Sequence, residues 1–61
     1  MRSLNSMIQM LDGLRGTKDV TKWEDDFIAS IVTLSGGGRK TSHLSEPQVE
    51  QIDRLYHKHF A

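Results

Sequence analysis

Apolar side chains recur at intervals of three and four residues in three stretches of the chain, which is the spacing of one face of an α-helix. The stretches carry Leu4, Met7, Ile8, Leu11 and Leu14, then Trp23, Phe27, Ile31 and Leu34, widened by Ile28 and Val32, then Val49, Ile52, Leu55, Tyr56 and Phe60. No stretch shows the sustained alternation of a β-strand. The pattern predicts a small all-α domain of three helices, at about residues 4–15, 22–35 and 46–60.

Polar residues that can cap a helix stand before each stretch. Ser3 precedes the first, and the other two begin with Thr21-Lys22-Trp23-Glu24 and Ser45-Glu46-Pro47-Gln48. The last two match the capping box, in which a hydroxyl and an acid or amide three residues later each accept a backbone N–H. These signals sharpen the predicted starts of the helices.

Glycines mark the predicted ends of the first two helices. Gly16 follows the first stretch, and Gly36–Gly38 follow the second, where no helix would retain three glycines. We therefore expect one domain over residues 1–61. It comprises an amphipathic helix within 1–16 and a helical hairpin over 21–60, whose connection at 36–43 is flexible and basic.

The aromatic residues form two pairs, each one helical turn apart. Trp23 and Phe27 belong to the second predicted helix, and Tyr56 and Phe60 to the third. Packing of these pairs between the two helices would make the hairpin the tightest part of the fold. Alternatively, Trp23 or Tyr56 stays exposed as an interface anchor, since Trp and Tyr are enriched among the residues that dominate binding.

Size and composition argue against an enzyme. The chain has 61 residues, of which 36% are hydrophobic, and it has no cysteine. A domain of this size rarely encloses the several hundred Å³ of a ligand pocket, and without cysteine it has neither disulfides nor thiolate metal ligands. We expect no catalytic residues, no cofactor, no metal and no small-molecule substrate.

No apolar run could span a membrane and no signal peptide is visible, so we expect a cytoplasmic protein.

Three groups of residues superficially suggest chemistry. Residues 36–41 read Gly-Gly-Gly-Arg-Lys-Thr, but a phosphate-binding loop needs Gly directly before Lys and a preceding strand. His57 and His59 differ by two positions and so point to different sides of a helix. Glu24, Asp25 and Asp26 fan out around the first turn, where negative charge already stabilises the helix dipole. We expect none of the three to form a nucleotide, metal or catalytic site; the alternatives are a basic loop that touches phosphate or an acidic protein surface, and an acidic patch that faces a partner.

A three-helix domain this small cannot bury all of its apolar side chains, and an exposed apolar patch commonly marks an interface. We predict a partner-binding surface formed with the help of the first helix. Its partner is either a second copy of the chain or a larger protein. The first helix packs on the hairpin or docks on that partner. The surface comprises Met7, Met10, Leu11, Leu14, Trp23 and Tyr56.

A weak nucleic-acid-binding surface is the alternative. Its phosphate contacts would be Arg39, Lys40, His43, Arg54 and Lys58, with Lys22 as a further candidate. Eight basic and eight acidic residues cancel, however, whereas a nucleic-acid-binding domain usually has a basic excess. Protein interaction is therefore the preferred interpretation.

Residues 23–60 resemble a small helical hairpin of phage and prophage proteins of DNA metabolism. The shared pattern is W..DF..SI, a glycine-containing spacer and LSE.Q...I..IY.K, carried here by Trp23, Asp26-Phe27, Ser30-Ile31, Leu44-Ser45-Glu46, Gln48, Ile52, Leu55-Tyr56 and Lys58. The resemblance implies a phage origin, an accessory or host-modulating role, and a host or phage protein as partner. It implies no catalytic residues, and it does not include the first helix or Arg39-Lys40.

Overall fold

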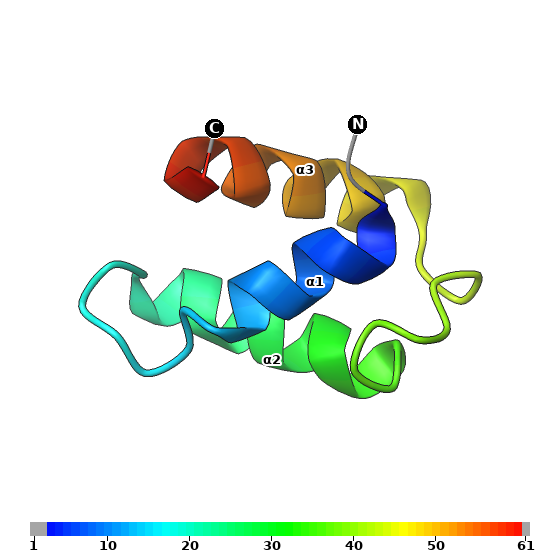
Figure 1. Ribbon diagram of the computed structural model, residues 1–61, viewed down its shortest axis with the longest axis horizontal. Coiled ribbons are helices and arrows are strands. Elements are labelled where there is room, and N and C mark those ends of the chain that lie inside the picture. Colours follow the sequence, from blue (N-terminus) through cyan, green and yellow to red (C-terminus); the bar gives the residue numbers. More distant parts are fainter. Residues whose placement is uncertain (1–2, 61) are drawn as a thin grey trace.

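The computed structural model describes residues 3–60, which form three α-helices and no strand (Figure 1). The helices are α1 (Leu4–Asp12), α2 (Lys22–Leu34) and α3 (Glu46–Phe60). The predicted all-α, three-helix class is therefore confirmed, and α2 and α3 begin and end within one residue of the predicted positions.

The predicted capping residues begin all three helices. The Ser3 hydroxyl accepts the backbone N–H of the residue three positions later. At α2, the Thr21 hydroxyl accepts the Glu24 N–H while the Glu24 carboxylate accepts the Thr21 N–H, at 3.1 and 2.8 Å. At α3, the Ser45 hydroxyl accepts the Gln48 N–H at 3.4 Å, and the Gln48 side-chain oxygen accepts the Ser45 N–H at 2.8 Å. Both predicted capping boxes are present.

The first helix is shorter than predicted, because α1 ends at Asp12 rather than near residue 15. Gly13 follows directly and favours the end of a helix, since it costs about 1 kcal/mol relative to alanine in a helix interior. Beyond it the chain makes tighter turns, in which the Leu14 and Arg15 N–H groups bond to carbonyls three residues back. Gly16 then adopts a φ of 76°, which turns the chain toward α2.

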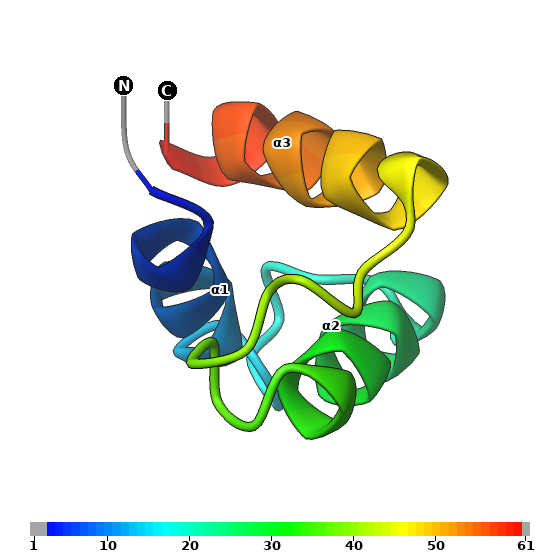
Figure 2. The same ribbon diagram turned by 90° about the vertical axis from the view of Figure 1, so that its right-hand side faces the viewer.

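The central helix of the fold is α1, which packs against both α2 and α3 (Figures 1 and 2). The side chains of Met7 and Ile8 project about 100° apart around the axis, and this gives α1 a face broad enough for two neighbours. By contrast, α2 and α3 make few direct contacts with each other. The expectation that these two helices form the tightest pair was wrong.

Seven apolar side chains form the core, and α1 supplies three of them although it is the shortest helix: Met7, Ile8, Leu11, Ile28, Ile31, Ile52 and Leu55. Met7 and Leu11 are only 7% and 2% exposed. Both were predicted to bind a partner, and both are instead buried in the core. They lie on the side of α1 that faces α2 and α3, so they are not available at the surface.

The glycine-rich connection is packed on α1 where it begins. The buried Ser35 hydroxyl donates to the Ile31 carbonyl at 2.6 Å and accepts the Gly38 N–H at 3.0 Å. Gly38 has a φ of 95°, and a Cβ there would lie 3.2 Å from the Asn5 carbonyl oxygen. This close approach to α1 requires glycine. The predicted flexible connection is thus a defined turn at its glycine end.

Candidate protein-binding surface

Helix α2 is packed into the molecule along one side only. That side carries Glu24, Ile28 and Ile31 and continues to Ser35 just beyond the helix, and all four are buried. Their spacing of four, three and four residues keeps them on one face of the helix. The fully buried residues of α2 therefore form a single stripe, and Phe27 and Val32 on either side of it are partly buried against the core.

A second stripe with the same spacing remains on the outside of α2. We call it the outer stripe, and it comprises Trp23, Phe27, Ser30 and Leu34. Trp23 and Leu34 are 58% and 50% exposed, and Phe27 is half-buried against the core. The Trp23 and Phe27 rings stack with centroids 5.5 Å apart and planes 4° apart. The outer stripe thus presents a rigid aromatic pair at one end and an exposed leucine at the other.

Small side chains make a shallow hollow in the second half of the outer stripe. The hollow is open to solvent and is lined by Ala29, Ser30, Thr33 and Leu34. It lies on the same helix as the aromatic pair and one to two turns further on. The surface therefore combines a protruding part, at Trp23 and Phe27, with a recessed part, at Ala29 and Ser30.

An ionic cluster beside Trp23 joins the start of α2 to the end of α3. The buried Glu24 carboxylate accepts a hydrogen bond from the Lys58 ammonium at 2.8 Å, and His59 Nε2 lies 3.5 Å from the same oxygen. The Lys58 bond, with the bond from the Thr21 N–H, lowers the pKa of Glu24 from 4.5 to about 2. The cluster therefore holds a carboxylate anion and fixes the position of the outer stripe relative to α3.

The six residues predicted to bind a partner occupy three different environments. Met7 and Leu11 are core residues, as described above. Leu14 and Tyr56 are half-buried and pack against the core, and Met10 is half-buried. Among the six, only the side chain of Trp23 is largely exposed to solvent. The structure does not bring the six together as one surface.

Two residues that the sequence analysis assigned to inward-facing stripes are exposed instead. Leu34 stands eleven positions after Trp23 and shares its side of the helix, whereas the core uses the stripe of Ile28 and Ile31. Phe60 is 39% exposed, with its ring 5.6 Å from that of Tyr56. A helical projection would have grouped Leu34 with Trp23 and apart from Ile28, but the contact with α1 decides which of the two stripes is covered.

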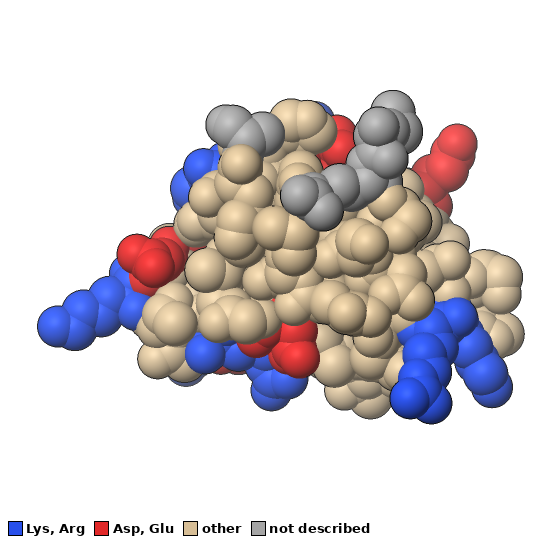
Figure 3. Space-filling view, viewed as in Figure 1, with Lys and Arg blue, Asp and Glu red and all other residues tan. Residues whose placement is uncertain are grey.

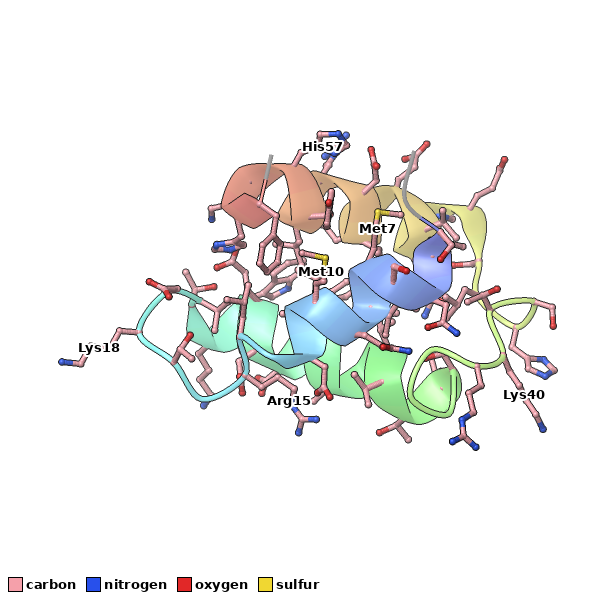
Figure 4. All side chains as sticks on the ribbon, viewed as in Figure 1. Met7, Met10, Arg15, Lys18, Lys40 and His57 are labelled. Atoms are coloured by element: carbon pink, nitrogen blue, oxygen red, sulfur yellow. The ribbon has the colours of Figure 1, made fainter. Side chains whose placement is uncertain are left out.

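The predicted nucleic-acid contacts do not gather on one face. Arg39, Lys40, His43 and Arg54 are exposed, while Lys58 bonds to Glu24. Ser45 lies before the first turn of α3 and Lys58 in its last, which separates them by about 20 Å along the axis. Lys40 lies at the end of the molecule where α3 begins, far from Lys58 (Figure 4). On the face shown in Figure 3, Lys and Arg side chains project at both ends of the molecule rather than from one patch.

The glycine-rich turn does not have the backbone geometry of a phosphate-binding loop. The N–H groups of Gly36 and Gly37 bond to carbonyls at the end of α2, and that of Gly38 bonds to the Ser35 hydroxyl. These donors are therefore directed into the turn, whereas a phosphate-binding loop directs them at the ligand.

Within residues 3–60, no three His, Cys, Asp or Glu side chains gather in a way that could hold a metal ion. In the same part of the chain, no helix has the length and apolar character needed to cross a membrane.

The chain matches no family model, and no curated protein or solved structure is significantly similar to it.

Proposed function

We propose that this protein is a small, non-catalytic protein-interaction module that binds through the outer stripe of α2. The observation that supports this proposal most directly is the exposure of Trp23 and Leu34, at 58% and 50%, on a helix whose neighbouring stripe, about 100° around the axis, supplies the core. Covering apolar surface contributes about 25 cal/mol per Å² removed from water. Folding leaves the apolar surface of the outer stripe in contact with water, and a bound partner would remove it from water.

The side chains of the outer stripe also suit an interface chemically. Trp is among the residues that most often dominate the energy of protein–protein binding. Trp23 is held in place by its stacking on Phe27, so little side-chain freedom would be lost when a partner covers it. The stack is in turn anchored by the contact of Phe27 with the core.

The proposal includes the accessory role that the resemblance to phage hairpin proteins implies. The partner is then a second copy of the chain or a host or phage protein, met in the cytoplasm of the host. The residues that carry the resemblance are largely caps and core positions, whereas Trp23 and Phe27 belong to both the shared pattern and the outer stripe. This overlap is consistent with an interface on α2.

A capture experiment tests the proposal. The tagged chain is mixed with a host lysate that also contains an untagged copy of the chain, and bound proteins are identified. We expect binding that is lost with Trp23→Ala and with Leu34→Ala, because each removes an exposed apolar anchor. Phe60→Ala is the matched control, since it removes an exposed aromatic outside the stripe and should retain binding.

Circular dichroism should show that all three variants remain helical, because none of the replaced side chains is buried. Binding that persists in both stripe variants, for every captured protein, would contradict the proposal.

A further inference from the structure

We infer that the outer stripe of α2 pairs with the same stripe of a second copy of the chain, with the two helices antiparallel across a twofold axis. This inference rests on the proposed function and names its partner. It is carried by two properties of the surface, one of shape and one of charge.

The shape of the outer stripe is self-complementary in the antiparallel direction. A twofold axis that passes α2 midway between Ile28 and Ala29 sets Trp23 opposite Leu34 of the second copy. The same axis sets Phe27 opposite Ser30 of the second copy, where the shallow hollow lies. The protruding aromatic pair of each copy would therefore enter the recessed half of the other. Such mutual fit of one patch with itself is what a twofold interface requires.

The charges at the two ends of α2 are complementary in the same direction. Around its start, Glu24 is buried and paired with Lys58, and the other charged residues of 18–26 are three acids and two lysines. Residues 34–43, around its end, contain Arg39 and Lys40 and no acid. Lys40 is held close to the helix end, because its N–H bonds to the Ser35 carbonyl at 2.8 Å. Figure 4 shows Lys18 and Lys40 at opposite ends of the molecule.

Antiparallel pairing sets the acidic end of each α2 against the basic end of the other, at two equivalent places. Parallel pairing would instead set like charges together. Asp26 is exposed near the acidic end and takes part in no ion pair among residues 3–60. In this register it lies opposite Ile31 of the second copy, about one helical turn from Ser35, so the long side chains of Arg39 and Lys40 must extend along the helix to meet it. Opposed macrodipoles of the two helices favour the same direction.

The paired surface is small, since α2 has 13 residues and is about 20 Å long. Stable complexes typically bury about 800 Å² per partner, and one helix face contributes less. We therefore expect a weak dimer that forms and dissociates as the concentration changes.

Sedimentation equilibrium at low salt, from about 1 μM to 1 mM chain, tests the inference by charge reversal. Asp26→Lys and the double variant Arg39→Asp, Lys40→Asp should each raise the dissociation constant about tenfold or more. An equimolar mixture of the two should restore association, because the reversed charges attract at one end and the native charges attract at the other. The weakening in each variant alone distinguishes the antiparallel arrangement, because parallel pairing sets like charges together in the wild type as well, and the recovery in the mixture shows that the loss is one of charge and not of fold.

Trp23→Ala should also yield a monomer, and the helical spectrum of each variant checks that it is folded. A wild-type chain that stays monomeric up to 1 mM would overturn the self-pairing. So would a dimer that Trp23→Ala and both charge variants leave intact. If the chain is monomeric while a lysate protein is still captured in a Trp23-dependent way, the proposed function stands without a second copy. If neither the self-association nor the capture of a lysate protein depends on Trp23, the self-pairing and the proposed function both fail.

Discussion

Leu11→Ala is expected to lower the free energy of unfolding by about 2 to 5 kcal/mol, the range for truncating a buried leucine. Leu11 is 2% exposed and lies on the central helix, so the cavity would open where α1 meets its neighbours. The total stability of a domain this size is only about 3 to 9 kcal/mol. We therefore expect thermal unfolding followed by circular dichroism to show a large fall in melting temperature or a chain that is partly unfolded at 37 °C.

Met10→Ala is the control for this prediction, because Met10 is the half-buried neighbour of Leu11 on the same helix. It should cost clearly less than Leu11→Ala. A melting temperature that Leu11→Ala leaves unchanged would contradict the central position of α1.

Glu24→Ala is expected to cost about 2 to 3 kcal/mol at neutral pH. The substitution removes the Glu24 half of the capping box and the hydrogen bond from Lys58, and bonds to charged groups contribute about 1.5 to 3 kcal/mol. The exposed part of Lys58 can be solvated afterwards, which limits the loss. Glu24→Gln is the matched variant, because glutamine keeps the capping box and removes only the charge.

The stabilisation from Glu24 should depend on pH in a defined direction. The pKa of Glu24 is about 2 in the folded protein and 4.5 in the reference state. The unfolded chain therefore binds more protons between these values, so this contribution is complete above pH 4.5 and is lost as the pH falls toward 2.

Urea unfolding of wild type and Glu24→Gln across this window should show their difference in free energy shrinking as the solution becomes acidic. A constant difference would contradict the ionic role of Glu24.

Local signals predicted the helices well. The capping residues Ser3, Thr21 and Ser45 begin helices as their chemistry requires, because capping depends on neighbours within one turn. The end of α1 was misplaced because Gly13 interrupts a stripe that continues to Leu14. The spacing of apolar residues alone does not show that the helix ends at a glycine within the stripe.

The arrangement of the helices and the exposure of individual residues were harder to predict. Helix α2 carries two apolar stripes, and its own sequence does not show which one α1 will cover. The core uses Ile28 and Ile31, which leaves Trp23 and Leu34 outside. Likewise, the glycine-rich turn looked like an open connection, because the contact of Gly38 with Asn5 joins residues far apart in the sequence. Long-range packing decided each of these positions.

The fluorescence of the single tryptophan tests the central claim that the outer stripe is free in the isolated protein and covered on binding. In dilute protein, Trp23 should emit near the wavelength of a tryptophan in water and be readily quenched by iodide, because it is 58% exposed. As the concentration rises or a captured partner is added, emission should shift to shorter wavelength and quenching should fall. Emission that is already shifted and protected in the dilute monomer, or that stays unchanged when association occurs, would contradict the claim.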